Sequence, residues 1–208
     1  MRSEERQKNS DFLSATDPFD VFNAWLDEAS KSEVNDPNAA SLATVDETGM
    51  PNVRVVLVKA VDASGFVIYT NLTSQKGKEL LGQRKAALVF HWKTLGRQVR
   101  ARGPIIDVST EDADAYYASR PRGSRIGAWA SNQSSPLEHD GALKLRVEEV
   151  TARFDGEDDI PRPPNWGGFK LEPVEMELWH DRPYRLHDRI QFKRSTTASP
   201  WTSARLYP

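Results

Sequence analysis

The 208-residue sequence predicts a mainly β fold with flanking helices, arranged as a closed or nearly closed barrel. From residue 39 onward, apolar and polar residues alternate in short runs, and this period of two is typical of strands. Turn-forming residues separate the runs at hairpin spacing, which favours an antiparallel meander over a parallel α/β array. The pattern indicates roughly eight strands and four helices.

Residues 1–16 are polar, and we expect a flexible segment there, followed by a single domain over residues 17–208. A helix is predicted at this boundary, because Asp17 suits the N-cap and Pro18 suits the first helical position. The apolar face of this helix is expected to consist of Phe22, Trp25, Leu26 and Ala29.

The first strands are predicted after a loop over residues 31–38, at 41–45, 52–61 and 66–70. Ser74 is a candidate N-cap for a helix to about Gln83, with Leu80 and Leu81 facing inward. Two further strands are expected at 86–92 and 97–108. The second should bend at Gly103-Pro104, because proline is poorly tolerated inside a central strand.

The next helix is predicted to be capped by Thr110, with acidic residues in its first turn that suit the helix dipole. The segment 119–134 then combines basic, small and aromatic residues. The remaining elements are expected to be a helix at 137–154, a proline-rich loop at 156–165, and strands at 166–171, 174–179, 185–194 and 201–206.

Composition limits the classes of function. The net charge of −2 provides no global positive field to recruit nucleic acid. The absence of cysteine excludes disulfides, thiolate metal sites and a cysteine nucleophile, and it fits a cytoplasmic protein. The first residues lack the apolar core of a secretory signal, and no window has the apolar length of a membrane span.

The stretch RLHDR at 185–189 has a pattern that suits chemistry. On a strand, Arg185, His187 and Arg189 would share one face, because side chains alternate. Two cations beside an imidazole suit an anionic ligand that undergoes proton transfer. The alternative is an edge strand whose charges prevent aggregation.

Other cations adjoin apolar strands or helix starts. Arg54 and Lys59 would point to opposite faces of a regular strand, so they would serve different anionic groups or face solvent. Lys76 lies in the first turn of the helix that Ser74 begins, and free N–H groups at such a start suit a phosphate.

The segment after the tyrosine-rich helix places cations beside a hydroxyl, at Arg120, Arg122, Ser124 and Arg125. This set suits a phosphomonoester, since arginine and hydroxyl donors bind phosphate oxygens. A nucleic-acid patch would use the same residues, but no aromatic ladder is interleaved with them. One face of the 97–108 strand would carry Gln98, Arg100 and Arg102, and Gln98 would either hydrogen-bond a planar heterocycle or face solvent.

The four histidines, at positions 91, 139, 180 and 187, show no ligand spacing, so no metal site is expected. The glycine-rich dinucleotide motif, the P-loop lysine motif and the G-x-S-x-G elbow do not occur. A nucleotide cofactor would therefore be held by a different arrangement.

Several motifs nevertheless resemble one family in their order along the chain. They are RVVLVK at 54–59, FVIYTN at 66–71, RQV at 97–99, SRP at 119–121, IGAWAS at 126–131, QS at 133–134, WGG at 166–168, RLHDR at 185–189 and RL at 205–206. The chain resembles the pyridoxamine (pyridoxine) 5'-phosphate oxidases over residues 17–208, nearly its whole length.

The resemblance implies an FMN-binding split β-barrel that forms a homodimer with FMN at the subunit interface. It implies oxidation of pyridoxamine or pyridoxine 5'-phosphate to pyridoxal 5'-phosphate, with O2 reduced to H2O2. The implied FMN residues are Arg54, Lys59, Tyr69, Thr70, Lys76, Gln98, Gln133, Ser134, Trp179 and Arg189. The implied substrate residues are Lys59, Tyr116, Arg120, Ser124, Arg185 and His187, of which the first four would hold the phosphate and the last two would be catalytic.

Two departures from the family pattern stand out. Gln75 occupies a position where the family often has an arginine, so one phosphate cation is replaced by an amide. The N-terminal segment is short, and Arg2 and Arg6 are poor matches to the residues that cover the substrate in some members.

Two rival functions stay open. One is another flavin oxidase of the same fold, such as a phenazine-biosynthesis oxidase, but that branch lacks the Lys59 equivalent and the 126–131 motif. The other is a carrier or sensor that binds flavin or pyridoxal phosphate without turnover. Neither the preferred substrate nor a second, allosteric site can be derived from these residues.

Overall fold

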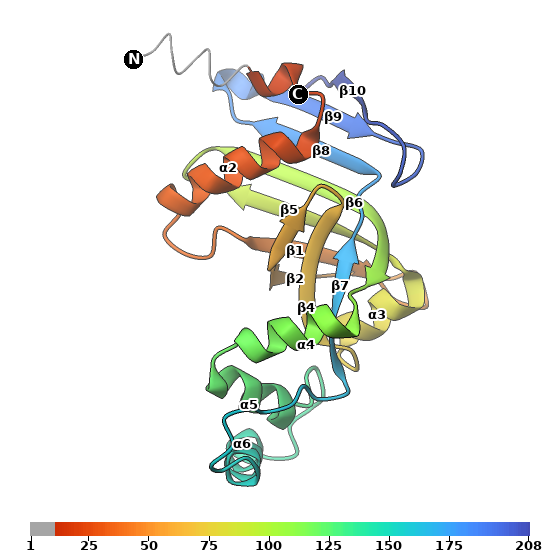
Figure 1. Ribbon diagram of the computed structural model, residues 1–208. Coiled ribbons are helices and arrows are strands. Elements are labelled where there is room, and N and C mark those ends of the chain that lie inside the picture. Colours follow the sequence, from red (N-terminus) through yellow and green to blue (C-terminus); the bar gives the residue numbers. More distant parts are fainter. Residues whose placement is uncertain (1–10) are drawn as a thin grey trace.

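A curled antiparallel sheet forms the centre of the computed structural model, which describes residues 11–208 (Figure 1). The strands are β1 (Ala39–Val45), β2 (Pro51–Leu57), β3 (Ala60–Asp62), β4 (Gly65–Asn71), β5 (Lys85–Trp92), β6 (Arg97–Asp107), β7 (Trp166–Leu171), β8 (Glu175–His180), β9 (Asp188–Lys193) and β10 (Thr202–Arg205). The helices are α2 (Pro18–Ser32), α3 (Gln75–Gln83), α4 (Thr110–Ser119), α5 (Arg122–Ala130) and α6 (Ala142–Arg153), with 3-10 turns η1 (Asp11–Ser14) and η2 (Pro183–Arg185).

Strand β6 is the branch point of the sheet. Its first half pairs with β8 and its last residues pair with β7, so the hydrogen-bonded order β10-β9-β8-β6-β5-β1-β2 acquires a second arm through β7, β4 and β3. The change of partner falls at Gly103-Pro104, where the sequence predicts a bend. A Cβ on Gly103 would lie 2.1 Å from the carbonyl oxygen of Glu172, so only glycine fits this crossing.

The main core fills the concave side of the sheet, which α2 crosses (Figure 1). Asp17 caps α2 as predicted, since its carboxylate accepts the Phe19 N–H at 2.8 Å. Phe22 then packs edge-on against Phe66 and Phe90, with ring centroids 5.0 and 4.9 Å apart. Helix α2 therefore joins both arms of the sheet into one core.

Regular structure begins before the predicted domain boundary at residue 17. Phe12 in η1 is buried against Trp25 and belongs to the main core. Residues 1–10, including Arg2 and Arg6, lie outside the described part of the chain. In residues 11–208 no helix is both long and apolar enough to cross a membrane.

Two predicted strands have different boundaries in the structure. The strand expected at 52–61 is interrupted at Val58 and Lys59, whose N–H groups bond to Asn38 and Val67 instead of continuing one ladder. The strand expected from Arg185 begins only at Asp188.

Several helix predictions need smaller corrections. The cap of α4 is Ser109 and not Thr110, and α6 begins at Ala142 and not at Leu137. Leu81 is exposed, whereas Leu80 is buried as expected. The segment 119–134 contains a helix, α5, that its basic and small residues did not predict.

Candidate active site

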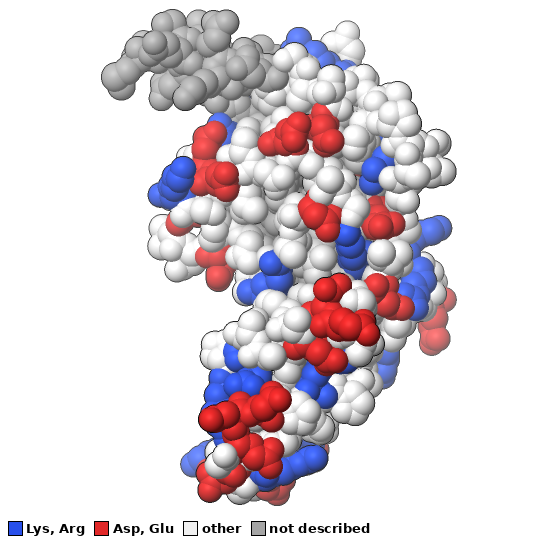
Figure 2. All heavy atoms as spheres, in the orientation of Figure 1, with Lys and Arg blue, Asp and Glu red and all other residues white. Residues whose placement is uncertain are grey.

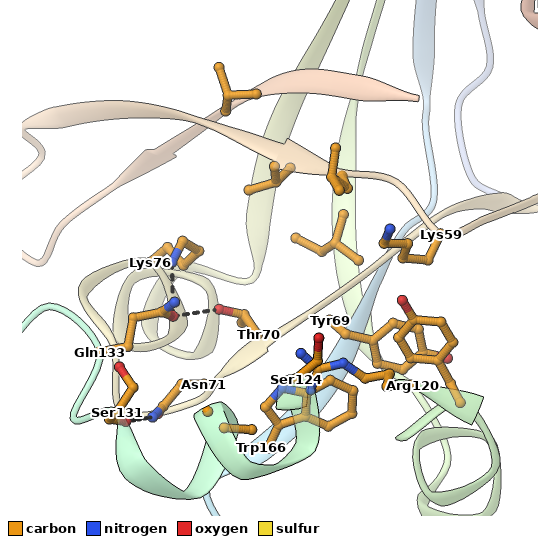
Figure 3. Close-up of a pocket in the computed structure, with 17 residues that line it drawn as sticks. Lys59, Tyr69, Thr70, Asn71, Lys76, Arg120, Ser124, Ser131, Gln133 and Trp166 are labelled. Carbon is orange, nitrogen blue, oxygen red and sulfur yellow. Dashed lines mark hydrogen bonds between the residues drawn. The ribbon is translucent and has the colours of Figure 1, made fainter. Parts of the chain in front are cut away.

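A cavity of about 500 Å³ opens beside β2 and β4, where α3, α4 and α5 meet the sheet. Eight residues of the predicted site line it, namely Lys59, Tyr69, Thr70, Lys76, Tyr116, Arg120, Ser124 and Gln133. Figure 3 shows these side chains in two groups, with Lys76, Thr70 and Gln133 at one end and Lys59, Tyr69, Arg120 and Ser124 at the other.

The first end is formed around the start of α3. Ser74 caps this helix by accepting the Gly77 N–H at 3.2 Å. Gln133 accepts hydrogen bonds from Lys76 Nζ and Thr70 Oγ1, both at 3.1 Å (Figure 3). Burial, followed by the nearby charge of Arg54, lowers the pKa of Lys76. An anion here would offset that repulsion, so this end suits a phosphate.

Arg54 does not line the cavity, although its charge acts on Lys76. Its guanidinium donates to the buried carboxylate of Glu79 at 3.0 Å and also to Thr44. Ser134, next to Gln133, does not line the cavity either and has a positive φ of 70°. The first end thus has Lys76, Thr70 and Gln133 as lining groups and Arg54 as a charge behind them.

The second end brings together donors from separate elements. Lys59 comes from the break between β2 and β3, Tyr116 from α4, Arg120 from the α4–α5 connection and Ser124 from α5. Nη1 of Arg120 is buried and has no hydrogen-bond partner within residues 11–208. A buried guanidinium nitrogen without a partner costs free energy, which a bound phosphate oxygen would recover.

Aromatic rings stack at the second end. Tyr69 lies parallel to Tyr116, with centroids 4.1 Å apart, and to Trp166, at 5.2 Å, and the Tyr116 and Trp166 centroids are 6.2 Å apart. Arg120 lies 5.0 Å above the Trp166 ring. A Cβ on Gly168 would approach Tyr69 to 2.7 Å, so this glycine lets the ring lie flat on β7. Burial raises the pKa of Tyr69 and of Tyr116, which keeps both hydroxyls protonated as hydrogen-bond donors.

Trp166 was not assigned a role from the sequence. The only signal for it was the WGG motif at 166–168, which gives no function for the indole ring. Asn71 and Ser131 also line the cavity and were not singled out; Asn71 Nδ2 donates to the Ser131 carbonyl at 3.4 Å (Figure 3).

The other predicted residues lie on the C-terminal strands. Gln98, Trp179 and Arg189 are neighbours in register across β6, β8 and β9, so they form one row on the outer face of the sheet. Glu177, which is buried, binds Arg189 through Nε and Nη2, both at 2.8 Å, and Arg100 at 3.0 Å. The outward position of Gln98 is one of the two predicted alternatives.

Arg185, His187 and Arg189 do not share a strand face, so that prediction is wrong. Tyr184 and Arg185 both have a φ of 61°, which places them in a tight turn before β9. His187 follows the turn, with its ring centroid 4.6 Å from that of Trp179. Its Nδ1 lies 3.0 Å from Asp181 Oδ1 and 3.2 Å from the Arg182 backbone nitrogen.

The two groups of predicted residues are far apart within one chain. In Figure 1, β8 and β9 lie at one end of the molecule, and α4 and α5 lie towards the other. A single chain therefore does not bring Arg185 and His187 to Arg120 and Ser124.

Figure 2 shows basic and acidic side chains interspersed over the visible face, so this face has no extended patch of positive charge. Within residues 11–208 no group of three or more His, Asp or Glu side chains is arranged to hold a metal ion.

Comparison with protein families gives two matches along the chain. The model of a family described as pyridoxamine 5'-phosphate oxidase matches residues 26–154. A second model, described as the pyridoxine 5'-phosphate oxidase C-terminal dimerisation region, matches residues 166–208.

Similar proteins carry the same name. The chain is 60% identical over 206 residues to a pyridoxine/pyridoxamine 5'-phosphate oxidase of Agrobacterium fabrum, a match that covers 99% of this chain and 100% of that protein. It is 61% identical to the enzyme of that name from Rhizobium meliloti, over 95% of this chain and 96% of that one.

Two solved structures share the fold. PhzG from Burkholderia lata, crystallised with tetrahydrophenazine-1-carboxylic acid, superimposes with a TM-score of 0.86 at 30% identity, over 93% of this chain and 94% of that one. An FMN-binding protein related to pyridoxamine 5'-phosphate oxidase, from Nostoc punctiforme, gives a TM-score of 0.72 at 18% identity, over 93% and 100% of the two chains. The split-barrel fold is therefore confirmed.

Proposed function

This chain belongs to the pyridoxamine 5'-phosphate oxidase family, and from that premise we propose that it oxidises pyridoxamine or pyridoxine 5'-phosphate to pyridoxal 5'-phosphate. The observation that carries the proposal is the cavity with cationic groups at both ends and stacked aromatic rings at the second end. Two phosphate-bearing ligands, the cofactor FMN and the substrate, match the two ends.

The donors at the α3 end fit the FMN phosphate. Lys76 and Thr70 supply a cation and a hydroxyl there, with Arg54 adding charge from behind. FMN held here would supply the hydride acceptor that no side chain provides, for a reaction in which O2 is the oxidant and H2O2 the by-product.

The second end fits the phosphate of the substrate. Lys59 and Arg120 contribute charge, and the hydroxyls of Tyr116 and Ser124 donate hydrogen bonds. Anchoring the phosphate at a fixed distance from the cofactor orients the carbon that is oxidised, which is a large part of the catalytic task.

Arg185 and His187 complete the proposal as the residues that orient the substrate ring and move its proton. They lie at the opposite end of their own chain, so they would act in the cavity of a second copy. Gln98, Trp179 and Arg189 would meet the flavin of that same cavity. The match of residues 166–208 to a dimerisation region supports this arrangement.

Exposed apolar side chains give the second copy a surface to pack against. Val53 and Val55 on the edge strand β2 have 65% and 69% of their area exposed, and Met50 precedes them with 64%. Exposed apolar residues grouped on one strand are typical of an interface.

The proposal also covers the domain organisation of the chain and its location in the cell. Residues 17–208 would act as a single oxidase domain, and the small helical cluster around Ile126, Phe154 and Ile160 would support helix α5, which lines the cavity through other residues. We expect the enzyme in the cytoplasm, a location supported by the lack of cysteine.

The decisive experiment starts from the protein loaded with FMN. Adding pyridoxamine 5'-phosphate in air should release H2O2 and pyridoxal 5'-phosphate in equal amounts, and pyridoxamine without its phosphate should react far more slowly. Uptake of FMN without peroxide release would indicate a carrier or sensor. A protein that takes up no FMN would contradict every flavin-dependent function.

A further inference from the structure

Glu79 of α3 has no role in the proposed site so far, yet its carboxylate is buried, with 4% of the residue exposed. It accepts four hydrogen bonds from side chains of three elements. The donors are Thr44 of β1, Asn52 and Arg54 of β2, and Gln75 of α3. Burying a carboxylate costs free energy unless hydrogen-bond donors satisfy its oxygens. The four donors must therefore keep their positions around Glu79.

The arrangement fixes one guanidinium. Arg54 donates Nη2 to Glu79 at 3.0 Å, and its Nη1 donates to Thr44 Oγ1 and to the Leu42 carbonyl at 3.4 Å. Thr44 in turn donates to the same Glu79 oxygen, which closes a ring of three side chains. Arg54 therefore cannot change rotamer without breaking several bonds at once.

The fixed guanidinium acts on the α3 end of the cavity. Arg54 lowers the pKa of Lys76 and Glu79 raises it, so both charges are close to this lysine. Although burial alone would raise it, the bonds from Thr44, Gln75, Asn52 and Arg54 lower the pKa of Glu79 to about 2. The carboxylate is thus ionised at neutral pH and holds Arg54 as a charged pair.

Gln75 belongs to the same ring of contacts. Its Nε2 donates to Glu79 Oε1 at 2.8 Å, on the carboxylate oxygen that Arg54 does not use. Gln75 is not one of the lining residues of the cavity. Its amide therefore orients the carboxylate, and does not take the place of a missing cation.

We propose that Glu79, together with Gln75, is a positioning residue that holds Arg54 beside Lys76, so that the two cations form a preorganised site for the FMN phosphate. The inference rests on the proposed function, because it assumes FMN at this end. Fixing the arginine during folding removes the entropy cost of ordering it when the cofactor binds.

The test compares FMN with riboflavin, which has the same ring and ribityl chain but no phosphate. Binding to the apoprotein is measured by flavin fluorescence. Glu79→Gln should weaken FMN binding about tenfold, as expected for one charge-assisted hydrogen bond, and change riboflavin binding less than about twofold. In an Arg54→Ala background the same substitution should have no further effect on FMN.

If Glu79→Gln does not fold, a milder variant and its matched control still test the proposal. Gln75→Ala removes one bond to the carboxylate and should weaken FMN binding about threefold, with riboflavin unchanged. Gln83→Ala is the matched control, since Gln83 lies on the same helix and, among residues 11–208, its side chain bonds only to the Asp46 carbonyl. It should leave the affinities for both flavins unchanged.

The outcomes separate this inference from the proposed function. Wild-type protein that binds neither flavin would overturn both. Wild-type protein that prefers FMN, with Glu79→Gln or Gln75→Ala weakening both flavins equally, would overturn only the positioning role and indicate a general effect on stability. Tighter FMN binding in Glu79→Gln would also overturn it, because the carboxylate would then merely repel the phosphate.

Discussion

At the scale of single residues, the partners of an arginine decide whether it is available to a ligand. The sequence grouped Arg120, Arg122 and Arg125 as one basic cluster. In the structure Arg122 donates to the carbonyls of Phe154 and Glu157 and so ties α5 to the end of α6. Arg120 instead has a buried nitrogen beside the cavity that finds no partner in the described part of the chain. Composition predicts the cluster, but the separate role of Arg122 depends on contacts with residues more than thirty positions away in the sequence.

Removing the Arg120 guanidinium should weaken the hold on the substrate phosphate. We expect Arg120→Ala to raise the KM for pyridoxamine 5'-phosphate by about 10- to 100-fold, the range for one charged hydrogen-bonding group. Lys59→Ala should act in the same direction. Steady-state kinetics of the FMN-loaded protein measures this, with Lys144→Ala as control, since that side chain is 82% exposed on α6. An unchanged KM would remove Arg120 from the phosphate site.

Arg185 tests the other half of the proposed site. Because it is assigned to the substrate and not to the cofactor, Arg185→Ala should lower kcat at least about 100-fold while the FMN content of the purified protein stays near that of wild type. Absorbance of the flavin and turnover are measured on the same sample. Near-normal turnover would exclude the catalytic role.

At the scale of elements, the pattern of the sequence predicts strands well where the ladder continues and fails where a turn interrupts it. The stretch 185–189 alternates regularly, yet the turn at Pro183 forces positive φ at Tyr184 and Arg185. Alternation describes which face a residue would occupy, but it does not report where a strand begins. The bend of β6 was predictable because Gly103 and Pro104 mark it directly.

Gly103→Ala should destabilise the fold at that bend. The new Cβ would meet backbone atoms of Glu172 at 2.1 and 2.9 Å, so the two strands must separate. We expect a loss of about 1–3 kcal/mol in the free energy of unfolding, measured by urea denaturation. Gly82→Ala on α3 is the control, because no atom of another part of residues 11–208 would lie within 4 Å of the new Cβ, and it should be neutral or slightly stabilising. Equal effects of both substitutions would contradict the steric reason.

His180, at the end of β8, should make stability depend on pH. Burial, followed by the charges of Arg182 and Arg97, lowers its pKa from 6.5 to about 4, so the folded state keeps it neutral where the unfolded chain binds a proton. The contribution of neutral His180 to the free energy of unfolding is complete above about pH 6.5 and is lost as the pH falls towards 4.

The expected loss from this histidine is roughly 2 kcal/mol between pH 7 and pH 5. Urea denaturation of wild type and His180→Gln at both pH values isolates it, because all other titrating groups are common to the two proteins. The variant should show a smaller drop in stability over this interval. An equal drop in stability for wild type and His180→Gln would show that His180 has the same pKa in the folded and the unfolded state.

At the scale of the whole molecule, the predicted residues divide between two ends of the chain. The sequence supplied both halves of the proposed site, because the motifs that carry them are local. Their separation could not be derived from local pattern, since it depends on how β6 branches and on which end of the sheet receives β8 and β9. The resemblance alone implied that two chains share each cavity.

Mixing Arg120→Ala with Arg185→Ala should therefore restore activity at a substrate concentration far below the raised KM of Arg120→Ala. Arg120→Ala damages one half of each cavity and Arg185→Ala the other, so a mixed dimer keeps one intact cavity. A purified mixed dimer should recover about half of wild-type turnover, because one of its two cavities is intact. Co-expression with two affinity tags and assay of the doubly purified species tests this. No recovery in verified mixed dimers would show that each chain has its own complete site.

If each cavity is formed by two chains, ligand binding and dimerisation are thermodynamically linked. A molecule held by donors from both copies binds the pair but not the separated chains, so by mass action its binding free energy adds to that of the dimer. Reciprocity then requires that dilution which splits the dimer also releases the ligand. A cell short of flavin would hold a more dissociable protein, and the supply of cofactor would set how much of the oxidase exists in its assembled form.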